Sequence, residues 1–402
     1  MSTVYTRLKR IIPAAWRGWI VRHGVGLSCF AAAVRTFLRA RLTRRPLLLV
    51  GSHTAIYNSN AYYFLKHACR ASWACVVGVA DPKSNRIMLR EGLPWVPKGG
   101  RMARSLAHRA KAVLGTARPI TDIGPEVAGA CQFLLYHGMP IKGIMKRDAK
   151  VPEEFPEIEH AIATSPLTAD SMASSFGLPR ERIACTGEPK TDGFVDVLRP
   201  DVRACLGGSF RRVVLYAPTH RDELLSRPGG SLTTVGIIES VVGSPQLREV
   251  LCRQQACMIV APHPWMRNMI KAPIRPPFFF SVDLDMYTEH LMAAADVLVS
   301  DYSSVILDWL LLSRPLSLYC PDIEEYKRNR GFPYFDFEQL FERMIHRDLE
   351  ALAAGLEQNL TGQKPDPEMD KLKRLFHQYD AGGAAERVLK RLRGVLEQSV
   401  QK

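Results

Sequence analysis

The stretch with the clearest chemical potential is Ser300-Asp301-Tyr302-Ser303-Ser304, where a short apolar run passes into a helical pattern. Residues 297–299 have the composition of a buried strand, and the apolar residues after the motif recur at helical spacing. Free backbone N–H groups at such a helix start, with the hydroxyls of Ser303 and Ser304, predict a phosphate-binding turn. Capping of the helix by the same side chains is the alternative.

Three histidines occupy the same position relative to predicted strands: His137, His220 and His263 each follow one. Ligands of open α/β sheets bind beyond the carboxyl ends of the strands, so we expect these side chains around one site. Neutral imidazole can take a proton from an alcohol, and imidazolium can donate to a phosphate oxygen. A structural role is the alternative for each histidine alone, and their shared position favours chemistry.

The elements that must position these residues alternate between strand and helix from Pro46 onward, which predicts parallel sheets covered on both faces. A length of 402 residues suits two domains, and Pro200, Gly207 and Gly208 precede a fresh strand. We therefore expect two doubly wound α/β domains, residues 46–204 and 205–402, with the terminal helices in the second.

Local patterns in the first domain give two sharper expectations. The run from Arg101 to Leu114 is strongly basic and predicts one helix, and Ile120 to Ile123 predicts a short strand. At the other end of the chain, a basic helix is expected from about Ala384 to Leu396.

The chain has a net charge of +14, and this charge is unevenly distributed because no acidic residue precedes Asp81. Residues 1–45 therefore predict basic amphipathic helices lying on an anionic membrane surface. The apolar positions of the second helix are Leu27, Phe30, Ala31, Val34, Phe37 and Leu38. An ordinary helix packed on the domain behind it is the alternative.

Several function classes find little support. No apolar run reaches the roughly 18 residues of a membrane span, no signal-peptide pattern is present, and we expect a cytoplasmic protein. Nucleic-acid binding is not expected, since stacking platforms and known motifs are missing. Nine scattered cysteines indicate neither a zinc site nor disulfides, and no carboxylate cluster suggests a metal or cofactor site.

Five motifs occur in series along the chain. They are His137-Gly138-Met139-Pro140-Ile141-Lys142, Gly187-Glu188-Pro189-Lys190-Thr191-Asp192, Leu215-Tyr216-Ala217-Pro218-Thr219-His220-Arg221-Asp222, His263-Pro264 and Ser300-Asp301-Tyr302-Ser303-Ser304. In this order they resemble the CDP-glycerol glycerophosphotransferases, which are teichoic-acid primases, polymerases and related capsule enzymes. The resemblance covers residues 133–337 and is specific because the motifs occur together.

The resemblance implies two facing Rossmann-like domains of glycosyltransferase-B type. It places the acceptor on the amino-terminal domain, the CDP-alditol on the carboxyl-terminal one, and the enzyme peripherally on the inner face of the cell membrane. The implied reaction transfers glycerol phosphate, or a related alditol phosphate, from the CDP-alditol to a hydroxyl of a lipid-linked glycan. CMP is released.

Residue roles follow from the matched motifs. The resemblance implies that His137 is the general base and that His263 contacts the donor phosphates. The acceptor side would include Gly138, Lys142, Pro189 and Lys190. The donor side would include Thr219, His220, Arg221, Ser300, Asp301, Ser303 and Ser304, with Arg221 offsetting phosphate charge and Asp301 fixing the turn.

Departures from the family pattern lie mostly on the acceptor side. Met139 stands where the family usually has Thr, Lys190-Thr191 replaces Arg-Asn, and the loop 51–60 is only loosely similar. An acceptor other than wall teichoic acid is therefore expected, such as a capsule or lipopolysaccharide-type glycan. Sugar transfer from a nucleotide sugar and a non-catalytic membrane adaptor are the alternative functions.

Overall fold

A computed structural model describes residues 27–52, 59–81, 91–143, 157–196, 201–206, 210–219, 221, 233–262, 266, 269–281, 287–362 and 367–401. Of residues 27–30, 41, 400 and 401 the structure describes only the backbone. The first predicted amphipathic helix, His220 and His263 lie outside the described residues.

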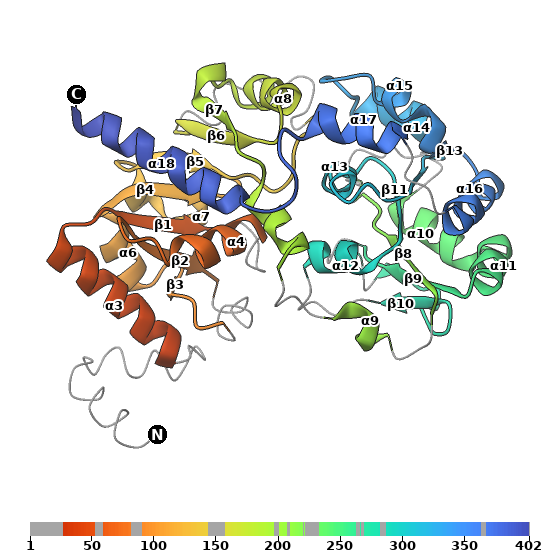
Figure 1. Ribbon diagram of the computed structural model, residues 1–402, viewed down its shortest axis with the longest axis horizontal. Helices are drawn as coiled ribbons and strands as arrows, with labels where there is room; N and C mark the ends of the chain where they lie inside the picture. Colours follow the sequence, from red (N-terminus) through yellow and green to blue (C-terminus); the bar gives the residue numbers. More distant parts are fainter. Residues whose placement is uncertain are drawn as a thin grey trace.

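The first sheet has, within the described ranges, seven parallel strands in the order β3-β2-β1-β4-β5-β6-β7 (Figure 1). The strands are β1 (Leu47–Gly51), β2 (Cys75–Ala80), β3 (Trp95–Pro97), β4 (Ala110–Gly115), β5 (Cys131–Leu134), β6 (His160–Ala163) and β7 (Ile183–Cys185). Its central strands are aliphatic and buried along their length, which is why they carry no polar alternation.

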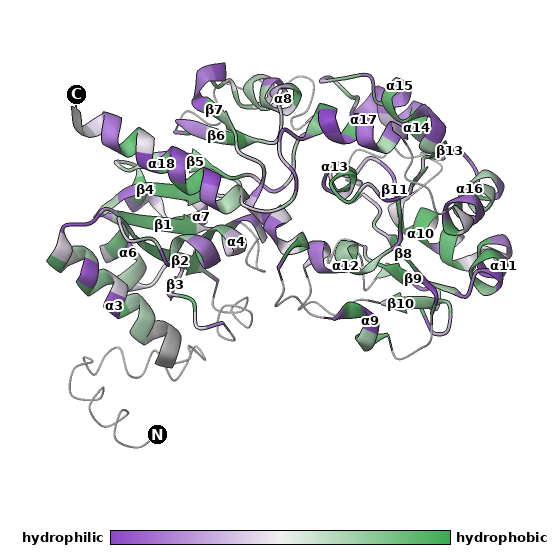
Figure 2. Cartoon of the chain, viewed as in Figure 1, coloured by the Kyte–Doolittle hydropathy of each residue, from purple (hydrophilic) through white to green (hydrophobic). Residues whose placement is uncertain are grey.

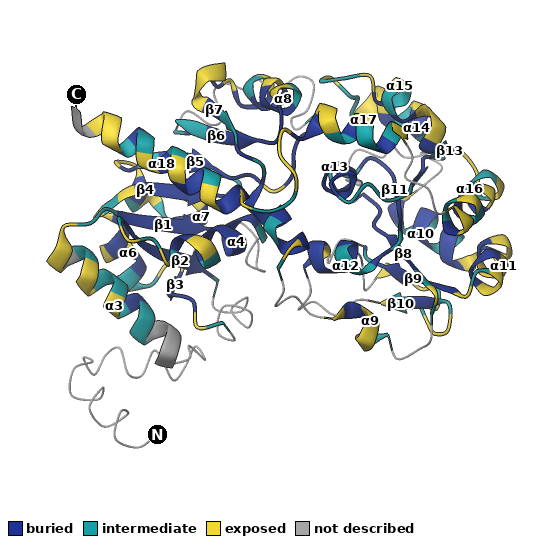
Figure 3. Cartoon of the chain, viewed as in Figure 1, coloured by how far each residue is buried: buried dark blue, intermediate teal, exposed yellow. Residues whose placement is uncertain are grey.

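The second sheet has six described parallel strands in the order β10-β9-β8-β11-β12-β13. They are β8 (Arg212–Tyr216), β9 (Ala256–Val260), β10 (Phe279–Ser281), β11 (Val297–Ser300), β12 (Leu316–Tyr319) and β13 (Ile345–His346). Figure 2 shows the strands of both sheets as mainly hydrophobic and Figure 3 as mainly buried. Two α/β domains, as predicted, are thus present.

Helices cover both sheets. Those with the first sheet are α3 (Leu27–Thr43), α4 (Ser59–Ala68), α6 (Arg101–Ala107), α7 (Pro119–Ile123), α8 (Pro166–Phe176) and α18 (Ala384–Gln401), with the 3-10 turn η5 (Pro189–Phe194). Those with the second are α9 (Val202–Cys205), α10 (Thr234–Gly243), α11 (Pro245–Arg253), α12 (Thr288–Ala294), α13 (Val305–Leu310), α14 (Ile323–Asn329), α15 (Phe337–Phe341), α16 (Leu349–Thr361) and α17 (Pro367–Phe376).

Two local predictions were wrong. The expected helix from Arg101 to Leu114 ends at Ala107, because residues 112–114 are fully buried between β1 and β5 and the sheet outweighs helix propensity. The expected strand Ile120 to Ile123 is the helix α7, which begins with Pro119, a residue suited to the first helical turn.

The terminal helix α18 also departs from the predicted domain division. Val388 and Leu392 are fully buried in one cluster with Leu48 and Val50 of the first sheet. The Asp192 carboxylate accepts the backbone N–H groups of Ala384 and Ala385, which caps the helix start from the first domain. Helix α18 therefore packs with the first domain rather than the second. The predicted domain boundary near residue 204 stays a prediction.

Helix α3 packs against the first domain along only part of its surface, and its predicted membrane contact stays a prediction. Ala33 is buried and Phe37 packs against the first sheet's core, as an ordinary covering helix would. Leu38 and Leu42, however, remain 46% and 80% exposed one turn apart. Within the described ranges, no helix has the length and apolar character that would let it cross a bilayer.

Candidate active site

A cavity of about 610 Å³ lies where the carboxyl ends of the two sheets meet. Its walls come from the loops after β5, β8, β9 and β11, as the strand-end rule predicts. Lys142 and Arg330 are among its lining residues, and none of the described lining residues is acidic. The cavity therefore suits an anionic ligand.

The predicted serine turn forms one wall of this cavity, and its members divide into two groups. Ser300 Oγ donates to the Ala217 carbonyl at 2.6 Å, and Asp301 Oδ1 accepts the Thr219 N–H at 2.8 Å. Both side chains are buried, so they tie the turn to the β8 loop. Ser303 and Ser304 instead line the cavity, and Ser304 begins α13 without a side-chain capping bond.

Arg221 lies behind the turn, outside the described cavity lining. Its side chain is 8% exposed, and it pairs with Asp322 through Nε at 2.8 Å and Nη2 at 3.0 Å. Nη1 stands 3.0 Å from Asp301 Oδ2, close enough for an ion pair although poorly aligned for a hydrogen bond. The positive charge of Arg221, which was expected to offset donor phosphate, is thus already balanced by two carboxylates. Arg221 instead holds the serine turn in place.

His137 stands on the opposite wall, after β5. Its Nδ1 is 2.9 Å from the Thr116 carbonyl oxygen, which can only accept, so Nδ1 carries the hydrogen. In the neutral ring the lone pair is then on Nε2. This tautomer suits the general-base role that the sequence suggested.

The predicted acceptor-side and donor-side motifs meet at Gly138. A Cβ on this residue would lie 2.4 Å from Ser304 Oγ and 3.6 Å from Lys190 Nζ, and its φ of 145° disfavours other residues. Glycine is therefore required for the His137 loop to reach the serine turn of the other domain.

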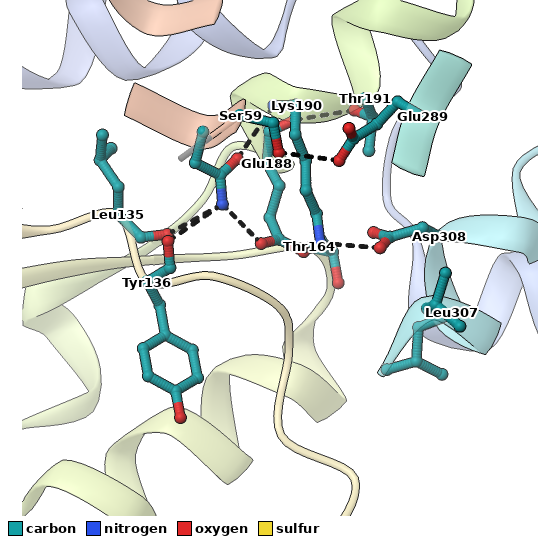
Figure 4. A network of polar contacts seen from close by, with 12 residues as sticks. Ser59, Leu135, Tyr136, Thr164, Glu188, Lys190, Thr191, Glu289, Leu307 and Asp308 are labelled. Carbon is teal, nitrogen blue, oxygen red and sulfur yellow. Dashed lines mark hydrogen bonds and ion pairs between the residues drawn. The ribbon is translucent and has the colours of Figure 1, made fainter. Parts of the chain in front are cut away.

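Lys190 lies in a buried network that joins the domains (Figure 4). Its Nζ is 2.7 Å from Asp308 Oδ2 on α13 and 3.4 Å from Glu188 Oε2. Because Lys190 and Pro189 are absent from the described cavity lining, their predicted acceptor contact has no support in the geometry. The lysine instead fixes the helix that follows the serine turn.

Asn60 on α4 completes this network and was missed by sequence reasoning. Its Nδ2 donates to Glu188 Oε1 at 2.8 Å and to the Tyr136 carbonyl at 3.1 Å, while Oδ1 accepts the Lys190 N–H at 2.9 Å. One side chain thus sets the His137 loop against the Glu188 loop. The available signal was an amide directly before the apolar run 61–65 of a helix.

Burial gives this network unusual acid–base properties. Desolvation raises the pKa of Glu188 to about 7 and that of Asp308 to about 6, although nearby Lys190 opposes both shifts. The lysine pKa is raised despite its burial, because Asp308 and Glu188 stabilise the ammonium. The Lys190 ammonium thus stabilises the ionised forms of both Glu188 and Asp308.

Some predicted residues stay untested. His220 and His263 lie outside the described residues, but Thr219 and Pro262, which directly precede them, line the cavity. Lys142 lines it as well. Within the described part of the chain, no group of three or more His, Cys, Asp or Glu is placed to hold a metal ion.

Two facing Rossmann-like domains with a basic cavity between their strand ends define a glycosyltransferase-B type architecture. A solved structure of the wall teichoic acid polymerase TagF shares this fold, with a TM-score of 0.68 at 18% identity, over 94% of this chain and 100% of that one. The chain belongs to the CDP-glycerol:poly(glycerophosphate) glycerophosphotransferase family, whose pattern matches residues 40–394.

Curated relatives agree with this membership. The teichoic acid ribitol-phosphate primase of Bacillus spizizenii is 30% identical over 209 residues, 50% of each chain. The teichoic acid glycerol-phosphate transferase of Staphylococcus aureus is 24% identical over 348 residues, 80% of this chain and 86% of that one. The chain spans half or less of the first relatives that it matches.

Proposed function

We propose that this protein transfers an alditol phosphate from a CDP-alditol to a hydroxyl of a lipid-linked glycan. Glycerol phosphate is the group that we expect first. The observation that carries the proposal is the contact of the His137–Gly138 loop with Ser304 across a cavity whose described lining has no acidic residue. Family membership and the TagF variant solved after a soak with CDPG support the donor.

The proposed mechanism assigns one step to each wall. The His137 Nε2 takes the proton of the acceptor hydroxyl as its oxygen attacks the phosphorus that carries the alditol. The bond from this phosphorus to the bridging oxygen breaks, and CMP leaves with the electron pair. Ser303 and Ser304 donate to the phosphate oxygens, with Lys142 and Arg330 adding positive charge. His263 is proposed to contact the same phosphates.

A donor screen tests this proposal. The full chain is incubated with CDP-glycerol, CDP-ribitol or a UDP-sugar, with membrane extract as acceptor, and thermal shift and nucleotide release are measured. We expect stabilisation by a CDP-alditol and CMP release that falls about 100-fold or more in His137→Asn. His108→Asn, at an exposed histidine that is not among the described lining residues of the cavity, is the matched control. Binding of the UDP-sugar alone, with nucleoside diphosphate release, would refute phosphotransfer.

We also propose peripheral attachment to the inner face of the membrane through α3. The support is the pair of exposed leucines, Leu38 and Leu42, beside the exposed Arg35 and Arg39. Exposed leucines next to arginines fit an anionic bilayer surface, where the apolar side chains enter and the cations meet lipid phosphates. A lipid-linked acceptor would then lie within reach of a membrane-bound enzyme.

A further inference from the structure

A second, larger groove of about 1100 Å³ lies at the opposite edge of the first sheet. Its walls come from the amino-terminal ends of β1, β4, β5 and β6 and from the carboxyl-terminal parts of α3 and α18. In Figure 1 these two helix ends lie at the left of the molecule, away from the second sheet. The groove is therefore separate from the candidate active site, which lies at the carboxyl ends of the same strands.

Basic side chains dominate this groove. Arg44, Arg45, Arg109, Lys111 and Arg393 line it, against the acidic Glu159 and Glu397.

The two carboxylates are already engaged. Glu397 pairs with Arg393 at 2.8 Å, and Glu159 accepts the Gln132 N–H at 3.0 Å. Among the described residues, no ion-pair partner is found for the other four cations of the groove, which are Arg44, Arg45, Arg109 and Lys111. The Nη1 atom of Arg45 is buried without a hydrogen bond. A buried, unsatisfied guanidinium nitrogen is costly, and an anion in the groove would satisfy it.

Aromatic and backbone features hold these cations in place. The Arg109 guanidinium lies 5.5 Å from the Phe37 ring centre, and that of Arg393 lies 5.8 Å from Trp73. Arg44 has a φ of 55°, a left-handed conformation that a non-glycine residue seldom adopts. This turn between α3 and β1 brings two consecutive arginines to the same groove.

The possible occupants can be narrowed by charge. The amino-terminal segment of this chain has no acidic residue before Asp81, and a second copy would carry the same net charge of +14. Neither complements a basic groove. Planar guanidinium groups match phosphate geometry, and the volume exceeds what one phosphate needs.

We infer that this groove is a second, non-catalytic site for a phosphodiester-linked chain, namely an acceptor or product bearing several alditol phosphates. The inference rests on the proposed function, which makes such a polyanion the enzyme's own acceptor or product. Binding there would keep the chain on the enzyme while the cavity is reloaded with donor.

Binding of a fluorescent glycerol phosphate oligomer to the full protein tests this site by polarisation. Arg45→Gln combined with Lys111→Gln should weaken binding by about tenfold or more and flatten its salt dependence. Arg211→Gln combined with Arg374→Gln removes the same charge from exposed, unpaired positions on the second domain and should change little. CDP-glycerol should stabilise the wild type and both double variants equally against thermal unfolding. If CDP-glycerol stabilises none of them, the proposed function is at fault rather than the groove.

Two results would overturn the inference. Equal weakening by both double variants would show that net charge alone attracts the oligomer. Loss of binding to anionic vesicles in the groove variant, with oligomer binding intact, would make the groove a membrane surface.

Discussion

Gly138 is the residue on which the meeting of the two half-sites depends. Gly138→Ala would force a Cβ against Ser304 Oγ at a φ that alanine rarely adopts, so the His137 loop must withdraw. We expect transfer activity to fall at least about tenfold and unfolding free energy by about 1–3 kcal/mol. Gly243→Ala is the control, since nothing lies within 4 Å of its added Cβ. Activity equal to that control would show that the contact is dispensable.

Glu188 should make stability depend on pH in an unusual direction. Its pKa is raised from 4.5 to about 7 by burial, so the folded state holds the proton more tightly than the unfolded state. The stabilisation is complete below pH 4.5 and is lost as pH rises through 7. Thermal melts at pH 5 and pH 8 should therefore show a larger loss for the wild type than for Glu188→Gln. Parallel changes would mean that Glu188 is ionised throughout.

At the scale of elements, the Lys190–Asp308 pair fastens α13 to the η5 turn. Lys190→Met leaves Glu188 and Asp308 without their cation, and breaking a buried pair costs about 3–5 kcal/mol. Urea unfolding should show that loss, with partial rescue by Lys190→Arg. Lys327→Met breaks a pair of the same 2.7 Å length with a lysine that is 57% exposed, and should change the unfolding free energy little because water screens this pair. Similar losses in both variants would deny the buried pair a special role.

Sequence reasoning succeeded where one local rule decides the outcome. Buried aliphatic runs followed by polar turns placed His137, Ser303 and Ser304 at strand ends, and the structure brings them to one cavity. It failed for Asn60 and Asp308, whose partners lie 130 and 118 positions away from them in the chain. Only tertiary packing reveals such pairs.

The same distinction explains the misassigned elements. Ala112 to Leu114 could continue a helix by pattern, and burial between two strands makes them β4. Helix α18 was predicted to lie with the second domain, whereas its apolar face packs in the core of the first. Tertiary burial decided both cases.

For the molecule as a whole, the exposed part of α3 is the surface on which the proposed membrane attachment can be tested. Leu38→Ser combined with Leu42→Ser should reduce binding to anionic vesicles about tenfold or more, since two leucines no longer enter the bilayer. Cosedimentation measures this. Met269→Ser combined with Leu375→Ser is the control, because these residues are 47% and 39% exposed and lie with the second domain. Equal losses would place the membrane contact elsewhere, whereas a selective loss with CDP-glycerol binding intact would orient the first domain toward the bilayer.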